Sequence, residues 1–173
     1  GSLSPRGAAL ARARDTLVAL GYFEAVTFSF IPEPHHAVFA PDAPAIALAN
    51  PIASDMSAMR PSLVPGLLAA ARFNRNRQQQ DIRLFEQGLA FRRQADELKQ
   101  ESMLAAIIVG RAVPAQWGMP ANDVDFYDLK QDLETLLAGL GCSDLRFEAA
   151  SHPAYHPRQF ARVLHAGRCV ATL

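Results

Sequence analysis

Apolar residues recur at helical spacing in three stretches of the chain, residues 4–20, 62–77 and 125–140. Apolar side chains three or four positions apart line one face of a helix, so each stretch predicts a helix with one buried side. The residues that open these stretches carry side-chain oxygens able to cap free backbone N–H groups. They are Ser4, Ser62 and Asp125.

Shorter stretches rich in β-branched and aromatic residues predict strands. Apolar and polar residues alternate over 82–91, and the uninterrupted apolar run 103–109 suits a strand covered on both faces. Residues 160–164 and 169–173 flank Ala166-Gly167 and predict a hairpin. Further strands are predicted over 25–30, 45–49 and 145–148, and loops over 31–44, 50–61 and 111–124.

The order of these elements is too irregular for repeated strand–helix–strand units. We therefore expect the class α+β, an antiparallel sheet with flanking helices. The last predicted strand reaches the final residue, so we expect residues 1–173 to be a single, C-terminally truncated module of a larger protein.

Composition narrows the class of protein. The chain has 173 residues, 50% hydrophobic and 20% charged, which excludes an intrinsically disordered chain. No apolar run approaches the roughly 18 residues that a membrane span needs, so we expect no membrane association. The two cysteines, Cys142 and Cys169, show no paired spacing, which argues against a disulfide scaffold and favours a reducing compartment such as the cytoplasm.

Charge is balanced over the whole chain but not along it. The 17 Lys and Arg match 17 Asp and Glu, so no globally basic surface points to nucleic acid. Residues 60–93 nevertheless hold seven arginines against two acidic residues, a net +5, whereas residues 123–134 carry −4. The basic stretch contains the helix predicted over 62–77, whose expected buried stripe is Leu63, Leu67, Leu68 and Ala71 and whose arginines are Arg72, Arg75 and Arg77.

Three groups of residues are candidate metal ligands, and none is expected to hold a metal. His152 and His156 lie four positions apart, but each precedes a proline, which favours a rigid loop over a shared helical face. His35 and His36 are adjacent and diverge, in a stretch that is predicted to be exposed. The acidic residues Asp123, Asp125, Asp128 and Asp132 could suggest Mg²⁺, but we favour stabilisation of a helix N-terminus.

Arg60, Glu86 and Arg92 are the main candidates for ligand binding. Arg60 lies just before a predicted helix, Glu86 lies within a predicted strand, and Arg92 ends it. An arginine and a glutamate that project from a sheet could hold a nucleotide phosphate and an amine or ribose. A structural ion pair across the sheet is the alternative that spacing alone favours. The chain has neither a Gly-rich phosphate loop nor a Gly-x-Ser-x-Gly elbow.

Six motifs in register carry a family resemblance. Residues 21–30 read Gly-Tyr-Phe-Glu-Ala-Val-Thr-Phe-Ser-Phe, and residues 50–68 begin with Asn-Pro-Ile and end with Arg-Pro-Ser-Leu-Val-Pro-Gly-Leu-Leu. The others occupy residues 74–77, 83–88, 125–130 and 152–157. In this order they resemble the beta chain of phenylalanyl-tRNA synthetase over nearly the whole sequence. One local departure is Arg158-Gln159, where the family usually has Gly-Arg.

The resemblance implies the catalytic-like core of that chain, on the antiparallel fold of class II aminoacyl-tRNA synthetases. Residues 4–20 and 25–30 are similar to motif one, the dimerisation element of the class. Residues 83–93 are similar to motif two, which in active enzymes supplies an Arg to the ATP α-phosphate and a Glu near the amino acid or adenine. Motif three has no counterpart here, and the family resemblance implies that the beta core is a non-catalytic relative of the active enzymes, with a degenerate ligand site at Arg60, Glu86 and Arg92.

The implied role is to scaffold the catalytic alpha chain in an assembly of two alpha and two beta chains. The whole ligase would join phenylalanine to its tRNA using ATP and Mg²⁺, while this part alone is expected to be inactive and to hold neither cofactor. The expected interface residues are Arg12, Leu17, Tyr22, Phe28 and Phe30. The alternatives are an active core that binds ATP and a tRNA contact through Arg72, Arg75 and Arg77, where Phe73 is the only aromatic residue available for stacking.

Overall fold

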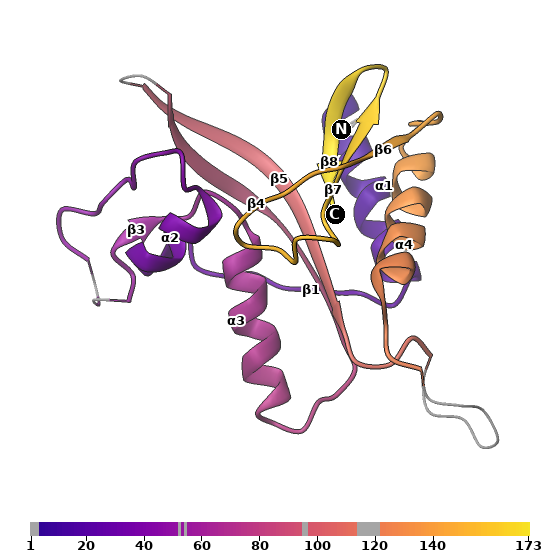
Figure 1. Cartoon of the computed structure of the whole chain (residues 1–173), viewed down its shortest axis with the longest axis horizontal. Helices are drawn as coiled ribbons and strands as arrows, with labels where there is room; N and C mark the ends of the chain where they lie inside the picture. Colours follow the sequence, from indigo (N-terminus) through magenta and orange to yellow (C-terminus); the bar gives the residue numbers. More distant parts are fainter. Residues whose placement is uncertain (1–3, 52, 54, 95–96, 114–121) are drawn as a thin grey trace. The chain divides into compact units, whose positions relative to one another are not determined.

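The computed structural model describes residues 4–51, 53, 55–94, 97–113 and 122–173 (Figure 1). The chain forms two compact units, one of Gly1–Phe23 with Ile108–Leu173 and the other of Glu24–Ile107. The predicted class α+β is confirmed, because helices are combined with three small sheets among the described residues. Strand β2 pairs antiparallel with β3, and β7 pairs antiparallel with both β6 and β8.

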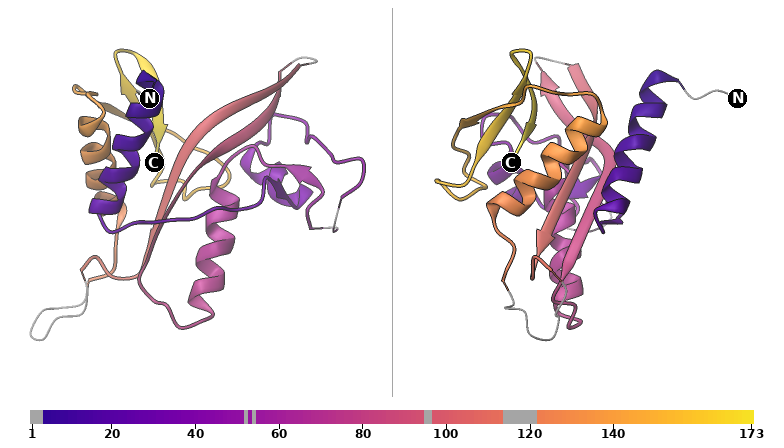
Figure 2. Two further views of the ribbon diagram at one scale, coloured as in Figure 1. Left: turned by 180° about the vertical axis from the view of Figure 1, so that it is seen from behind. Right: turned by 90° about the vertical axis from the view of Figure 1, so that its right-hand side faces the viewer.

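Two helices lie side by side in the first unit (Figure 2). α1 (Pro5–Ala19) packs on α4 (Phe126–Gly139), and the Tyr22 hydroxyl donates a 2.7 Å hydrogen bond to the Asp132 carboxylate. The caps predicted for these two helices are confirmed: Ser4 Oγ accepts from the Gly7 N–H at 3.1 Å, and Asp125 Oδ1 accepts from the Tyr127 N–H at 2.7 Å.

A three-stranded sheet completes this unit. Its order is β6 (Arg146–Ala149), β7 (Ala161–His165) and β8 (Arg168–Thr172). The predicted hairpin between β7 and β8 is confirmed. Ala166 and Gly167 have φ values of 47° and 76°, and two positive φ values match the tight turn that joins twisted strands.

The second unit is built around α3 (Val64–Arg75) and β4 (Ile82–Gln94), which pack on each other. β4 lies next to β5 (Glu97–Val109) in a sheet of order β1-β4-β5, where β1 is Phe23–Glu24. Leu63, Leu67 and Phe85 are fully buried in its core. The remaining elements are β2 (Phe30–Ile31), α2 (Glu33–Phe39) and β3 (Ala58–Met59), and β2 pairs with β3.

The prediction of a loop throughout residues 31–44 is wrong, because α2 occupies its middle. Pro32 precedes the helix and Pro34 lies in its first turn, where the fixed φ of proline suits a helix. The helix turns His36 inward to 3% exposure, so of the two adjacent histidines only His35 is exposed as expected. Burial lowers the pKa of His36, and the nearby Glu33 opposes that shift.

Other local predictions also need correction. Residues 25–29 lie outside any strand, residues 45–49 form only an isolated bridge between Ala47 and Ala58, and the predicted loop over 50–61 includes β3. Residues 103–109 form a strand as predicted but are half-buried rather than covered on both faces. Leu68, expected in the core, is 48% exposed. Most of the loop predicted over 111–124 lies outside the described residues.

Candidate functional site

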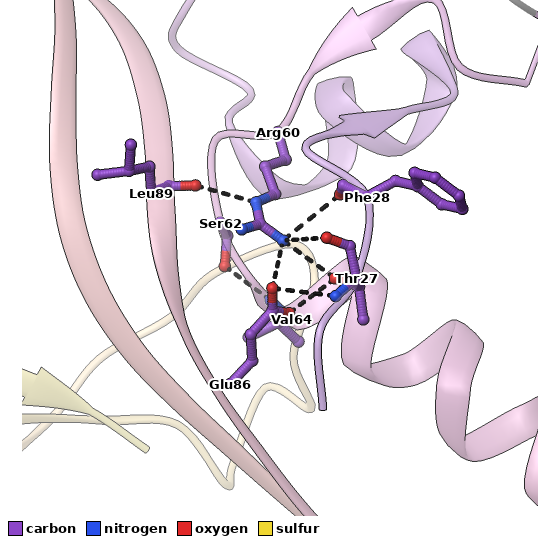
Figure 3. Close-up of polar contacts among 7 residues, drawn as sticks. All are labelled: Thr27, Phe28, Arg60, Ser62, Val64, Glu86 and Leu89. Carbon is purple, nitrogen blue, oxygen red and sulfur yellow. Dashed lines mark hydrogen bonds and ion pairs between the residues drawn. The ribbon is translucent and has the colours of Figure 1, made fainter. Parts of the chain in front are cut away.

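Arg60 and Glu86 meet in the second unit (Figure 3). Arg60 directly follows β3, and Glu86 projects from β4. Arg60 Nη1 lies 2.8 Å from Glu86 Oε1, and the two residues are only 3% and 2% exposed. They therefore form a buried ion pair, the alternative that their spacing favours.

Thr27 completes the site between the two charged groups. Its hydroxyl accepts a hydrogen bond from Arg60 Nη1 at 3.0 Å and donates one to Glu86 Oε2 at 2.7 Å. Its backbone N–H donates to Glu86 Oε1 at 3.2 Å. Arg60 also donates to three backbone carbonyls: from Nε to Leu89 at 2.9 Å, and from Nη1 to Phe28 at 3.4 Å and to Thr27 at 3.5 Å. Among the described residues, no buried side-chain nitrogen or oxygen lacks a hydrogen-bond partner.

This network explains why residues 25–29 do not form the predicted strand. The backbone of Thr27 and Phe28 bonds to the Arg60 and Glu86 side chains instead of to a neighbouring strand. Backbone bonds then hold Arg60 on both sides, because its N–H donates to Ser29 O at 2.9 Å and its carbonyl accepts from the Phe91 N–H at 2.9 Å.

Two glycines make room for the network. A Cβ at Gly88 would collide with Arg60 Nη2, and a Cβ at Gly66, in the first turn of α3, would collide with the Thr27 hydroxyl. Sequence reasoning missed Thr27 and both glycines as site residues. The available signal was that the motifs at residues 21–30, 50–68 and 83–88 each contribute to this one place.

The pair does not fit an ATP phosphate. The guanidinium of Arg60 is already matched by the Glu86 carboxylate, and a phosphate that displaced this carboxylate would leave a buried, uncompensated charge. Arg92, the third predicted residue, is exposed and is not among the residues that bond to Arg60 or Glu86 in the network described above. The structure thus brings together two of the three predicted residues, and their charged groups are buried against each other.

The predicted interface residues divide into exposed and buried ones. Leu17 and Tyr22 are 2% and 3% exposed, so they belong to the core of the first unit and not to its surface. Arg12 is exposed on α1, and Phe30 is half-buried in β2. Phe28 is 68% exposed.

Val26, which was not predicted, is 92% exposed close to Phe28. Both side chains are exposed, and Thr27, which separates them in sequence, is held by the Arg60–Glu86 pair. The signal that could have identified Val26 is its alternation with Thr27 and Phe28 in the sequence.

The arginines of the predicted RNA contact lie on the exposed side of α3 and just beyond its end. Arg72, Arg75 and Arg77 are all exposed. The Arg77 guanidinium lies 3.4 Å from the centroid of the Phe73 ring, so it already covers one face of that ring.

The candidate metal ligands have structural roles. Asp125 and Asp128 form a capping box at the start of α4, as the helix N-terminus explanation predicts. His152 Nδ1 accepts from the Ala154 N–H at 3.1 Å and His156 Nδ1 from the Arg158 N–H at 3.3 Å, within a loop rather than a helix. In the described part of the chain, no three His, Cys, Asp or Glu side chains are grouped to hold a metal ion.

Tyr155 packs in the same loop. Its ring stacks on Phe160 with centroids 4.7 Å apart, and burial raises the pKa of the Tyr155 hydroxyl.

Among the helices of the described residues, none has the length and apolar character to cross a membrane.

Solved structures share this fold. The chain matches a pyrrolysyl tRNA synthetase from Desulfitobacterium hafniense with a TM-score of 0.66 and 17% identity, over 95% of this chain and 54% of that one. It matches an ATP phosphoribosyltransferase regulatory subunit/histidyl-tRNA synthetase from Bacillus halodurans with a TM-score of 0.62 and 13% identity, over 83% and 36%. The expected synthetase-like core is confirmed at the level of the fold.

Sequence relatives are more specific. The chain is 47% identical over 164 residues to the phenylalanine–tRNA ligase beta subunit of Hahella chejuensis, covering 95% of this chain and 21% of that protein. It is 45% identical over 172 residues to that of Pseudomonas fluorescens, covering 96% and 22%. The chain thus spans about a fifth of the length of these curated relatives. The model of the phenylalanyl tRNA synthetase beta chain CLM domain matches residues 1–173, and the chain therefore belongs to this family.

Proposed function

We propose that residues 1–173 are a non-catalytic module of the beta chain of phenylalanine–tRNA ligase, which holds the catalytic alpha chain in place. The buried Arg60–Glu86 pair carries this proposal, since its groups are committed to Thr27 and to each other. The whole ligase, in the cytoplasm, would use ATP and Mg²⁺ to join phenylalanine to its tRNA. Its assembly would contain two alpha and two beta chains.

Val26 and Phe28 are the proposed alpha-chain contacts in the second unit. Side chains that are 92% and 68% exposed gain about 25 cal/mol for each Å² of apolar surface that a partner covers. The half-buried Phe30 follows in β2 and would supply the edge of the contact. In the first unit, the exposed Arg12 is the proposed contact on α1.

Co-purification with the alpha chain tests this contact. Val26→Glu places a charge where the partner would cover an apolar side chain, so we expect affinity for the alpha chain to fall by about tenfold or more. Val170→Glu is the matched control, because it makes the same change at a valine that is 42% exposed in β8. Equal recovery of the alpha chain with both variants would contradict the proposed contact.

ATP–pyrophosphate exchange tests the non-catalytic role separately. We expect the chain by itself to give no phenylalanine-dependent exchange, because Arg60 is not available to a phosphate. The assay includes the assembled ligase as a positive control. Exchange by the chain alone that Arg60→Lys abolishes would instead establish an active class II core.

A further inference from the structure

An apolar groove of about 430 Å³ lies between α2 and α3 in the second unit. Phe39 and the exposed His35 line its α2 side. Its α3 side is one continuous stripe of the helix, with residues at i, i+3, i+4, i+7, i+8 and i+11. These residues are Pro65, Leu68, Ala69, Arg72, Phe73 and Asn76.

The groove borders the core at the buried Pro65 but is otherwise open to solvent along α3. Leu67 and Ala71, on the neighbouring stripe of α3, are 0% and 4% exposed, whereas Leu68 and Phe73 are 48% and 54% exposed. α3 therefore has two apolar sides, and this chain covers only one of them. Exposed apolar side chains that gather in one place, with a polar rim, are typical of surfaces that contact another protein.

The rim of the groove is basic. Arg72 lines it, and Arg75 and Arg77 are exposed farther along the same helix and just past its end. Residues 62–77 contain no acidic side chain, and Glu33 on α2 is the acidic residue nearest in sequence to His35. A segment that covered the groove would bring its flanks against these arginines, so complementary flanks carry Asp or Glu.

We propose that this groove docks an acidic amphipathic helix of a partner protein. Apolar residues of that helix, spaced i, i+3, i+4 and i+7, would cover Leu68, Phe39 and Phe73, and its carboxylates would meet Arg72 and Arg75. The inference does not depend on the proposed function, because it concerns a different surface.

The observations favour a helix over RNA or a small molecule. RNA bases need open aromatic faces, but Arg77 covers one face of Phe73, and the other rings of the groove, His35 and the half-buried Phe39, lie on its α2 side. Small-molecule sites enclose most of their ligand, whereas the Leu68 and Phe73 walls stay half in solvent. A helix laid along α3 would cover both.

Fluorescence anisotropy with a designed peptide tests the proposal. The probe is a labelled helical peptide of about 18 residues with leucines at i, i+3, i+4 and i+7 and glutamates on both flanks. We expect saturable binding to the chain, and Leu68→Glu should weaken it by about tenfold or more. Leu98→Glu should leave it unchanged, since Leu98 is similarly exposed (51%) but lies on β5.

Charge reversal gives an independent readout. The double variant Arg72→Glu with Arg75→Glu should lose the glutamate-flanked peptide and bind a peptide with lysines in place of the glutamates. Arg6→Glu, at an exposed position on α1, should do neither. Circular dichroism establishes whether each variant is folded. If Leu68→Glu does not fold, the charge-reversal variant alone tests the proposal.

Three results would overturn the proposal. The first is equal binding of the glutamate and lysine peptides to the unmodified chain. The second is tight binding of a single-stranded RNA, lost in the double arginine variant, without peptide binding. The third is self-association of the chain that Leu68→Glu abolishes in sedimentation experiments, which would make a second copy the occupant.

Discussion

At the scale of single residues, the guanidinium of Arg60 joins stretches of chain that are far apart in sequence. It contacts Thr27 and Phe28, and it reaches Glu86 and Leu89 on β4. A buried ion pair of this kind contributes little through charge attraction alone, because both groups lose their hydration. Its importance lies in the cost of removing one partner and leaving the other buried.

Arg60→Ala should therefore lower the free energy of unfolding by about 3–5 kcal/mol, because it leaves the Glu86 carboxylate buried without its partner. Urea denaturation of the chain measures this change. Arg92→Ala is the matched control, and at an exposed site it should stay within about 0.5 kcal/mol.

A double-mutant cycle refines this test. If Arg60→Met with Glu86→Gln costs less than the sum of the two single changes, the two residues are coupled as the 2.8 Å contact implies. Strict additivity would mean that the pair contributes nothing beyond its separate bonds to Thr27 and Leu89.

At the scale of elements, the sequence predicted two of the three helix caps correctly, but it did not predict which side of α3 is exposed. Ser4 and Asp125 cap their helices as predicted, because capping depends on residues only two or three positions away. At α3 the assigned cap is Leu63, and the predicted cap Ser62 accepts only from the Val64 N–H at 3.2 Å. The exposure of Leu68 on α3 was also not predicted, because helical spacing does not show how wide a stripe of the helix the rest of the chain covers.

The cap of α4 provides a test at this scale. Asp125→Ala should cost about 1 kcal/mol of stability, because the N–H groups of Tyr127 and Asp128 lose their acceptor. Asp125→Asn keeps an oxygen in the same place and should remain near the unmodified stability. Thermal unfolding followed at 222 nm compares the variants, and equal losses for both would show that the charge rather than the hydrogen bond matters.

At the scale of the whole molecule, a neutral total charge conceals unlike surfaces. The exposed arginines of α3 form the basic rim of the groove between α2 and α3, while Arg60 and Glu86 cancel each other in the interior. The acidic residues of α4 cap that helix and bond to Tyr22. Net charge along the sequence therefore located the basic helix but did not separate buried charges from exposed ones.

The sequence by itself determined the class α+β, most helices and strands, the β7–β8 hairpin and the family. These depend on local spacing, on turn residues such as Ala166-Gly167, and on motifs in a set order. Only the tertiary structure decided the state of Thr27, Leu68 and His36. Their surroundings come from residues distant in sequence. Thr27 bonds to Arg60 and Glu86 instead of to a neighbouring strand. Leu68 lies in an open groove between α2 and α3. The burial of a residue and its bonding partners depend on the folded chain, so the local sequence pattern could not predict the roles of these residues.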